Sequence, residues 1–381
     1  MDFQLTEVQE LIQETAKDFA ESVLKPGVIE RDEKQYFPRE LIRQMGELGF
    51  LGMMVSPEYG GGGMDTLSYV LAMTEIAKWD ASAAVIMSVN NSLVCWGLET
   101  FGNEEQKQKY LTKLATGEWI GSFCLSEPEA GSDATQQKTT AEDKGDYYLL
   151  NGTKNWITNA GHADVYLVIA QTDVEKKHRG INALIVERTS AGFELGPKEN
   201  KLGIRGSDTH SLNFNDVKVP KENRIGADGF GFTFAMKTLN GGRIGIASQA
   251  LGIAEGSLNL AVGYAKIRKA FGTEIKNHQA IQFKIADMAM KVEGAKLLVY
   301  KAASDKDSGA DYVTSAAMCK LYASKIAMEC ASESIQIHGG NGYVKEYHVE
   351  RFLRDAKITE IYEGTSEIQR MVISRAYLKD K

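Results

Sequence analysis

The feature that most limits the possible folds is a change of hydrophobic periodicity along the chain, from helical to strand-like and back. Near the carboxyl end, apolar residues recur at helical intervals in three long segments, at about 232–268, 278–305 and 312–338. The first third has the same interval in shorter segments, at about 39–48, 66–79, 82–100 and 104–116. The capping patterns Thr6-x-x-Gln9 and Ser366-x-x-Gln369 predict a first and a last helix. We therefore expect helices at both ends and a helical bundle at the carboxyl end.

The middle of the chain has short runs rich in β-branched and aromatic residues, at 147–150, 155–158, 165–170, 181–186 and 212–219. Asn151-Gly152 is typical of a hairpin turn and predicts one between the first two runs. The alternation slips between Phe214 and Val217, which predicts a bulge or bend at Asn215-Asp216. We expect a helical domain at 1–120, an antiparallel β domain at 121–225 and a helical domain at 226–381.

Composition excludes several classes of protein. The 44 basic and 51 acidic side chains give a net charge of -7, which argues against a nucleic-acid partner. The longest nearly unbroken apolar run, at 48–55, is far shorter than the roughly 20 residues of a membrane-spanning helix, so no membrane insertion is expected. The acidic residues Asp2 and Glu7 are not typical of a targeting peptide, and we expect a cytoplasmic protein.

Common catalytic and metal-binding motifs are absent from the sequence. The four cysteines, Cys95, Cys124, Cys319 and Cys330, form no C-x-x-C pair, so we expect buried free thiols and no metal site. No G-x-G-x-x-G, G-x-x-x-x-G-K-[ST], H-E-x-x-H or G-x-S-x-G pattern occurs. Nicotinamide binding by a Rossmann motif, phosphate loops, zinc proteases and α/β-hydrolases therefore have no support in the sequence.

Three stretches carry the strongest functional signal. They are Phe-Cys-Leu-Ser-Glu-Pro-Glu-Ala-Gly-Ser-Asp at 123–133, Trp-Ile-Thr-Asn at 156–159 and Ile-Tyr-Glu-Gly-Thr-Ser-Glu-Ile-Gln at 361–369. With Arg268-x-x-Phe271-Gly272, His278-Gln279 and the Gln-Ile-His-Gly-Gly-Asn-Gly stretch at 336–342, the chain resembles the acyl-CoA dehydrogenase family from end to end. The segments 89–93 and 242–252 are most similar to its short-chain, butyryl-CoA-type members.

The resemblance implies an α+β multidomain fold with an amino-terminal helical domain, a central antiparallel β domain and a carboxy-terminal four-helix bundle that assembles a homotetramer. It implies FAD-dependent oxidation of a short-chain acyl-CoA, such as butyryl-CoA, to the trans-2-enoyl-CoA. It further implies that the β-hydride passes to flavin N5 and that an electron-transfer flavoprotein takes the electrons.

Glu363 matches the base of the family, which removes the α-proton. A carboxylate between Tyr362 and a flavin is expected to be desolvated and to have a raised pKa. Outside such a motif, an acidic residue just before a helix more often has no catalytic role and only interacts favourably with the positive end of the helix dipole. In some relatives the base stands at the position of Gly241 or Gly242 of this chain. Glycine has no side chain that could remove a proton, so no second candidate base competes with Glu363 here.

The resemblance also assigns the cofactor contacts. Residues expected beside the FAD of the same chain are Phe123, Leu125, Ser126, Gly131, Ser132, Trp156 and Thr158, with Thr365 and Glu367 on the adenine side. Residues expected to reach the FAD of a neighbouring subunit are Arg268, Phe271, Gln279, Gln336 and Gly340. A lone tryptophan in a strand is more often a core aromatic, and a lone Gly-Gly-Asn-Gly more often ends a helix.

Substrate contacts are implied for Ser132, Asn240, Arg243, Tyr362 and Gly364, with the Glu363 N–H and a ribityl hydroxyl of FAD holding the thioester oxygen. For Arg243, a helix-surface cation is the alternative. Two other functions remain open at this point. One is an acyl-CoA oxidase that passes electrons to oxygen, and the other is a non-catalytic scaffold that binds FAD or acyl-CoA.

Overall fold

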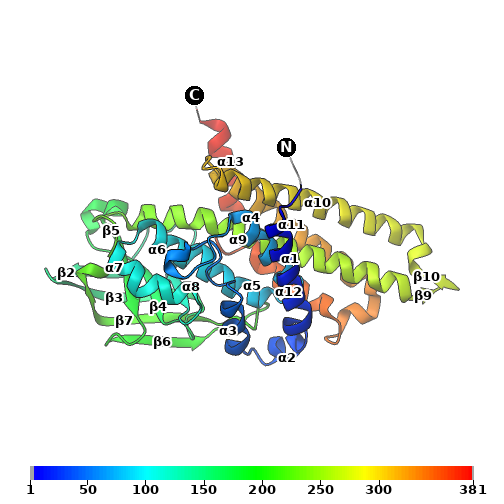
Figure 1. Ribbon diagram of the computed structural model, residues 1–381, viewed down its shortest axis with the longest axis horizontal. Helices are drawn as coiled ribbons and strands as arrows, with labels where there is room; N and C mark the ends of the chain where they lie inside the picture. Colours follow the sequence, from blue (N-terminus) through cyan, green and yellow to red (C-terminus); the bar gives the residue numbers. More distant parts are fainter. Residues whose placement is uncertain (1–3, 380–381) are drawn as a thin grey trace.

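The computed structural model describes residues 4–379 and confirms the predicted order of a helical part, a β part and a second helical part (Figure 1). The amino-terminal part contains α1 (Glu7–Phe19), η1 (Ala20–Leu24), α2 (Val28–Glu33), α3 (Arg39–Glu47), η2 (Pro57–Tyr59), α4 (Thr66–Ala77), α5 (Ala81–Ser88), η3 (Val89–Cys95), α6 (Trp96–Phe101), α7 (Glu104–Gln106), η4 (Lys107–Leu111) and α8 (Thr112–Ala115). The predicted capping box is present, since the Thr6 side chain accepts from the Gln9 backbone N–H. Thr6 therefore caps α1 as its sequence pattern predicts.

One stretch of 21 residues, Ala81–Phe101, is long and apolar enough to cross a membrane, but almost all of it is buried inside the protein. It consists of α5, the π-helix η3 and α6 in direct succession. Its apolar character is therefore explained by its place in the core. The predicted helix at 82–100 is confirmed, although its middle turn is wider than an α-helix.

The central part is a sheet of eight strands. They are β1 (Gly121–Cys124), β2 (Thr140–Asp143), β3 (Tyr147–Thr158), β4 (Val165–Gln171), β5 (Ile181–Glu187), β6 (Phe193–Lys198), β7 (Thr209–Pro220) and β8 (Arg224–Ile225), with η5 (Val174–Gly180) and η6 (Lys221–Asn223) between them. The order is β6-β7-β3-β2-β4-β5-β8, with β1 beside β4. The sheet is mainly antiparallel, as predicted, but β1 runs parallel to β4. All seven residues of β4 are buried, as is usual for a strand covered on both faces.

The predicted hairpin at Asn151-Gly152 is wrong, because β3 runs without a turn from Tyr147 to Thr158. The two residues form an irregularity within the strand, where the pairing with β7 shifts between Leu150 and Gly152. A Cβ at Gly152 would lie 2.7 Å from the Cα of Thr139, so the glycine permits close approach of two backbones. The same shift confirms the predicted bulge in β7, where Asp216 has a φ of 53°.

The carboxy-terminal part contains three long helices, α9 (Gly231–Ile267), α10 (Gln279–Asp307) and α11 (Val313–His338). The hairpin of β9 (Lys269–Ala270) and β10 (Thr273–Glu274), followed by η7 (Ile275–Asn277), joins the first two. After η8 (Gly339–Tyr343) come α12 (His348–Thr359) and α13 (Ser366–Leu378). At 1.5 Å per residue, the 37 residues of α9 span about 55 Å.

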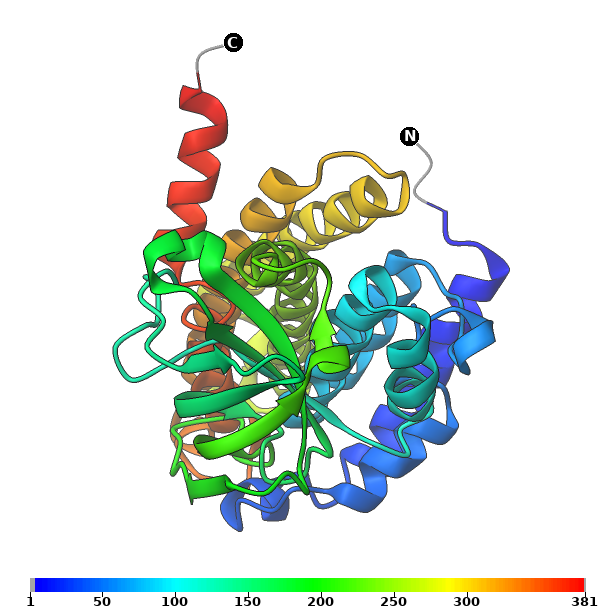
Figure 2. The ribbon, with the colours of Figure 1, turned by 90° about the vertical axis from the view of Figure 1, so that its left-hand side faces the viewer.

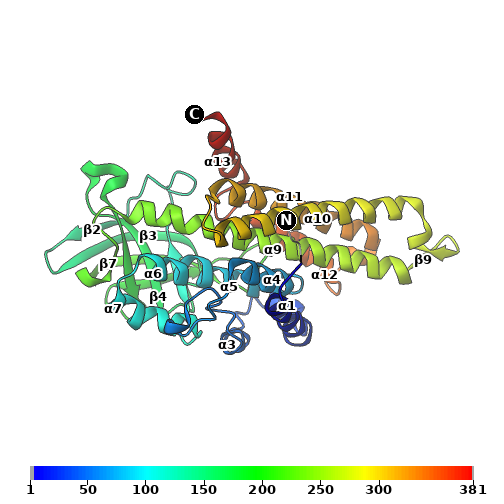
Figure 3. The same ribbon diagram turned by 45° about the horizontal axis from the view of Figure 1, so that its top comes forward.

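The helix α9 therefore connects two distant ends of the molecule. The sheet lies at one end of the long helices and the β9–β10 hairpin at the other (Figure 3). In the end-on view, the amino-terminal helices lie on one side of the sheet and the long helices behind it (Figure 2). One hydrophobic cluster includes Leu93 of η3, Phe123 of β1 and Ile244 of α9, so all three parts share a core. The four cysteines are free and buried, as predicted.

Candidate active site

The loop between α12 and α13 presents Glu363 in an unusual backbone conformation. Glu363 has a φ of 54° and Gly364 a φ of 89°, both in the left-handed region. The Ser366 N–H donates to the Glu360 carbonyl oxygen at 2.9 Å, which closes the loop. Thr365 caps α13, since its hydroxyl accepts from the Ile368 N–H at 3.4 Å. The loop is therefore fixed at both sides of Glu363.

The carboxylate of Glu363 is directed into the protein against α9. A Cβ at Gly242 would lie 2.7 Å from Glu363 Oε2 and 2.8 Å from Leu93 Cδ2, so glycine leaves the space that the carboxylate uses. Oε2 is buried and has no hydrogen-bond partner in the described part of the chain. Burial raises the pKa of Glu363 to about 7, and the positive charges of Arg243 and Lys320 oppose this rise. The direction agrees with the raised pKa predicted from the sequence.

Arg243 and Asn240 lie on the same helix, one turn apart. The Arg243 Nη1 donates to Asn240 Oδ1 at 2.7 Å. Arg243 is buried, which rules out a helix-surface cation, and its Nε has no partner among residues 4–379. Burial lowers the pKa of Arg243, while the charge of Glu363 raises it. The predicted substrate residues Asn240, Arg243, Tyr362 and Gly364 thus lie around Glu363.

Tyr362 has its ring packed against the core and its hydroxyl donates to Gln249 Oε1 of α9. Two more side chains donate hydrogen bonds to backbone carbonyl oxygens of the loop. Gln369 Nε2 donates to the carbonyl oxygens of Glu363 and Gly364, at 3.1 and 2.8 Å. The Lys320 ammonium donates to the Gly364 carbonyl oxygen at 2.8 Å.

A second group of predicted residues lies on the sheet. Trp156 is 62% exposed with a φ of 61°, so it is not a core aromatic. The Asn155 N–H donates to the Ser126 carbonyl oxygen at 2.9 Å, and Ser122 Oγ donates to the Thr158 carbonyl oxygen at 2.8 Å. These bonds bring the stretch containing Phe123, Leu125 and Ser126 beside Trp156 and Thr158.

Several polar groups of this second group are free to bind a ligand. The hydroxyls of Ser126, Ser132 and Thr158 have no hydrogen bond to another described residue. Gly131 and Ser132 are exposed, and nothing lies within 4 Å of a Cβ at Gly131. The group therefore offers an exposed aromatic face with unpartnered hydroxyls, which fits a polar, planar ligand such as a flavin.

The third predicted group lies at the end of the long helices that is far from the sheet. Within one chain it is therefore separated from the other two groups. Its members Arg268, Phe271, Gln279, Gln336 and Gly340 are all exposed. Phe271 is 97% exposed at the β9–β10 hairpin, with a φ of 53°. Gly339 ends α11 with a φ of 59°, so its stretch does end a helix, the alternative raised from the sequence. Thr365 and Glu367 lie with Glu363, and Glu367 is exposed and paired with Arg370 at 3.2 Å.

Sequence reasoning missed Lys320 and Gln369 as members of the site. Gln369 belongs to the third motif, but its spacing from Ser366 predicts only a helix cap. Lys320 is a charged residue on the otherwise apolar face of α11, among Ala316, Ala317 and Ala323. A cation at such a position is a signal that could have identified it, because a buried lysine requires a nearby acceptor.

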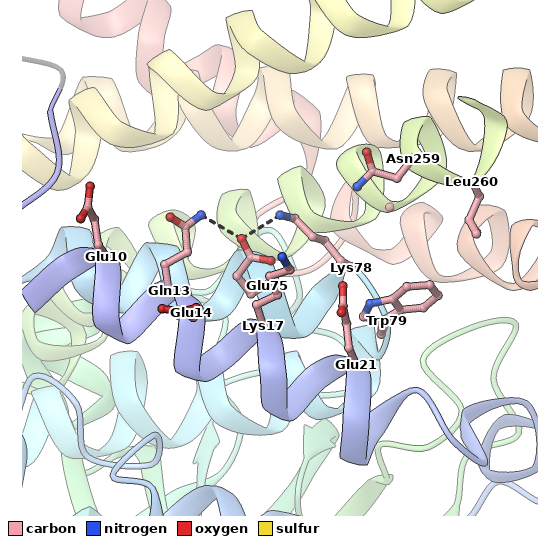
Figure 4. Close-up of a pocket in the computed structure, with 11 residues that line it drawn as sticks. Glu10, Gln13, Glu14, Lys17, Glu21, Glu75, Lys78, Trp79, Asn259 and Leu260 are labelled. Atoms are coloured by element: carbon pink, nitrogen blue, oxygen red, sulfur yellow. Dashed lines mark hydrogen bonds and ion pairs between the residues drawn. The ribbon is translucent and has the colours of Figure 1, made fainter. Parts of the chain in front are cut away.

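A surface hollow elsewhere is unrelated to these groups. It lies between α1, α4 and α9 and is shown in Figure 4. Glu75 accepts there from Gln13 Nε2 and Lys78 Nζ, both at 2.8 Å. Lys78 also pairs with Glu255 at 2.8 Å, so Glu75 and Glu255 share one cation in this hollow.

Three protein-family models match nearly the whole chain. They are described as the acyl-CoA dehydrogenase N-terminal domain, at residues 6–118, the middle domain, at residues 122–217, and the C-terminal domain, at residues 229–378.

Individual proteins match over their full length. The short-chain specific acyl-CoA dehydrogenase of Clostridium acetobutylicum is 50% identical over 374 residues, which are 98% of this chain and 99% of that protein. The solved structure of butyryl-CoA dehydrogenase from Megasphaera elsdenii is similar with a TM-score of 0.98 and 49% identity, covering 100% of both chains. A chain in the solved structure of the electron transferring flavoprotein of Acidaminococcus fermentans is similar with a TM-score of 0.99 and 51% identity, also covering 100% of both.

Proposed function

The chain belongs to the acyl-CoA dehydrogenase family, and from this premise we propose that it oxidises a short-chain acyl-CoA, such as butyryl-CoA, to the trans-2-enoyl-CoA. Glu363 removes the α-proton, the β-hydrogen leaves as hydride, and the electron pair of the α C–H bond forms the new double bond. When bound, FAD supplies the hydride acceptor at N5. The full-length similarity to butyryl-CoA dehydrogenase of Megasphaera elsdenii supports the short-chain substrate.

The observation that carries this proposal is the buried, unpartnered carboxylate oxygen of Glu363 with a pKa raised to about 7. A base works best when its pKa is near the working pH, since it is then both ionised and strong. The α C–H of a thioester is a weak acid, so the charge that develops on the thioester oxygen also requires hydrogen bonds. The Glu363 N–H, held by the fixed loop, donates one of them.

The residues of the sheet fit FAD. The indole of Trp156 and the side chains of Phe123 and Leu125 offer apolar contact for the ring system, and the free hydroxyls of Ser126, Ser132 and Thr158 offer polar contact. Gly131 leaves room for close approach. Thr365 and Glu367 contact the adenine side. Asn240, Arg243, Ser132, Tyr362 and Gly364 hold the acyl-CoA.

The far end of the long helices completes the site of a second copy. Arg268, Phe271, Gln279, Gln336 and Gly340 reach the FAD of a neighbouring subunit in a homotetramer. Support comes from their exposure and from the length of α9, about 55 Å, which separates them from the sheet of their own chain. The electron acceptor is an electron-transfer flavoprotein, and the location is cytoplasmic. We also propose that the three domains meet at 120/121 and at 225/226.

Anaerobic flavin bleaching by butyryl-CoA tests the function. Glu363→Gln removes the base but keeps the size of the side chain, so we expect reduction to slow by about 10³-fold while FAD stays bound. Glu105→Gln, an exposed acid on α7, is the matched control and keeps the wild-type rate. Wild-type reduction rates in Glu363→Gln would remove Glu363 from the mechanism.

Two further measurements separate the alternative functions. An oxidase produces one hydrogen peroxide per turnover in air, whereas the proposed dehydrogenase produces little. A scaffold is not reduced by any short acyl-CoA, even when FAD is bound. The free carboxylate oxygen of Glu363 argues against a scaffold, because burying an unpartnered acid lowers stability without a benefit to assembly.

A further inference from the structure

A fully buried lysine lies behind the loop that carries Glu363. Lys320 is 0% exposed, and its ammonium makes no ion pair with a carboxylate anywhere in residues 4–379. Its hydrogen bond to the Gly364 carbonyl oxygen, at 2.8 Å, joins α11 to the residue after the proposed base. An unpaired buried ammonium lowers the stability of a fold, so its position requires an explanation beyond packing.

The hydrogen bond from Lys320 is one of three that the consecutive carbonyl oxygens of Glu363 and Gly364 accept. Gln369, also 0% exposed, donates from α13 to the carbonyl oxygens of Glu363 and Gly364. Glu363 has a positive φ, which a residue other than glycine adopts only when its surroundings stabilise it. These hydrogen bonds supply that stabilisation. They fix both the direction of the Glu363 side chain and the direction of its N–H.

The charge of Lys320 acts on Glu363 as well. The ionisable groups that face Glu363 are Arg243 from α9, Lys320 from α11, Tyr69 from α4 and Tyr362 from the loop itself. Lys320 is also faced by Arg243, whose charge lowers its pKa, and by Glu360 and Glu367, whose charges raise it. Burial lowers the pKa of Lys320 to about 7, against the effect of Glu363. Where Lys320 is charged, it favours the ionised form of Glu363.

We propose that Lys320 is a positioning residue for the dehydrogenation, which holds the Gly364 carbonyl so that Glu363 stays aimed at the substrate, and which places a positive charge against the loop that carries the Glu363 carboxylate. This inference rests on the proposed role of Glu363 as the base. A purely structural role for Lys320 would change stability but not the pH at which Glu363 ionises.

The test compares Lys320→Met with Lys320→Arg in the FAD-loaded protein. Rates of anaerobic flavin reduction by butyryl-CoA are measured from about pH 5.5 to about pH 9, with infrared difference spectra that follow the protonated carboxyl band lost in Glu363→Gln. Without the charge, Glu363 holds its proton to higher pH. The acid limb of the pH–rate profile is the part where the rate falls with decreasing pH. We expect Lys320→Met to shift this limb, and the pH at which the carboxyl band disappears, upward by about one pH unit. We also expect it to lower the limiting rate about tenfold with less than about twofold change in KM.

Lys320→Arg keeps a charged donor and is expected to restore the position of the acid limb. The matched control is Lys325→Met, which removes an exposed lysine from the same helix and is expected to change neither quantity. Gln369→Met separates the two effects, because it removes hydrogen bonds to the loop and keeps the charge of Lys320. It should lower the rate without moving the limb.

An unmoved acid limb and carboxyl band in Lys320→Met, with FAD bound, would overturn the inference while leaving Glu363 as the base. Should Lys320→Met fail to fold, Lys320→Gln, which keeps an amide donor without the charge, is measured instead, and an unmoved band there overturns the inference equally. Wild-type reduction rates in Glu363→Gln would instead overturn the proposed function.

Discussion

The room available to Glu363 depends on one glycine in a long helix. A glycine inside a helix is less stable than alanine by roughly 0.5–1 kcal/mol, so its presence at position 242 has a cost. The benefit is space, since a Cβ there would lie within 3 Å of both Glu363 Oε2 and Leu93 Cδ2. Neither neighbour moves freely, because Leu93 lies in the core and Glu363 in the fixed loop.

Gly242→Ala is therefore expected to impair catalysis more than stability. The added methyl displaces the carboxylate, and we expect flavin reduction by butyryl-CoA to slow by about 10²-fold, a loss typical of a misplaced catalytic group. The control is Gly263→Ala in the same helix, where a Cβ meets no atom within 4 Å, and we expect it to raise the free energy of unfolding by about 0.5–1 kcal/mol. An unchanged reduction rate in Gly242→Ala would mean that Glu363 does not use this space.

Local motifs predict single residues well only when their partners are close in sequence. The motif at 361–369 predicts Glu363, Thr365 and Glu367 together, and the structure places all three in or beside one loop. Lys320 lies 44 residues before Gly364, and the helical pattern of α11 gives no sign of which loop its ammonium meets. The position of such a partner depends on how helices pack, which periodicity alone does not specify.

Among the elements, the π-helix η3 contains Leu93, whose Cδ2 would lie 2.8 Å from a Cβ at Gly242. Two buried asparagines connect it to the surrounding chain. Asn90 Nδ2 donates to the carbonyl oxygens of Leu51 and Leu114, and its Oδ1 accepts from the Gly121 N–H. Asn91 makes similar bonds, donating to Phe50 and accepting from the Met53 N–H. The bonds to Phe50, Leu51 and Met53 satisfy backbone groups of the 50–53 loop, which lie outside helices and strands.

Replacing Asn91 by alanine is expected to lower the free energy of unfolding by about 2–4 kcal/mol, because it leaves buried backbone groups of Phe50 and Met53 without partners. Chemical denaturation with circular dichroism detection measures the change. The comparison variant is Asn259→Ala, an exposed asparagine on α9, expected to stay within about 0.5 kcal/mol of wild type. Similar effects of the two substitutions would refute this account of η3.

Sequence patterns predicted the long elements far better than the irregular ones. The segments expected at 232–268, 278–305 and 312–338 correspond to α9, α10 and α11, because a long amphipathic period has few alternative explanations. The π-helices were not predicted, since an i→i+5 hydrogen bond leaves no distinct pattern of residues. Asn151-Gly152 misled because turn propensity is local, whereas the contact of Gly152 with Thr139 is not.

At the scale of the whole molecule, the long helix α10 carries exposed apolar side chains that a subunit contact would cover. Phe283, Met290 and Leu297 follow one another at seven-residue spacing on α10, and Phe283 and Met290 are 60% and 68% exposed. Seven-residue spacing places them on one face of the helix, as in helices that pack against a second helix. The Phe283 end of the stripe lies about one helical turn from Gln279, which is proposed with Phe271 to reach the FAD of a neighbour.

Met290→Glu tests whether this stripe joins subunits. Two or more carboxylates brought together in an apolar interface repel each other and lose hydration, so we expect association to weaken by about 10²-fold or more. Size-exclusion chromatography with light scattering should show a smaller particle than wild type. Absorbance should show less FAD per chain if, as proposed, part of each cofactor site comes from the neighbour. Val174→Glu, an equally exposed apolar residue beside the sheet, should change neither. An unchanged particle size would place the interface elsewhere, and a smaller particle that keeps all its FAD would show that each chain binds the cofactor alone.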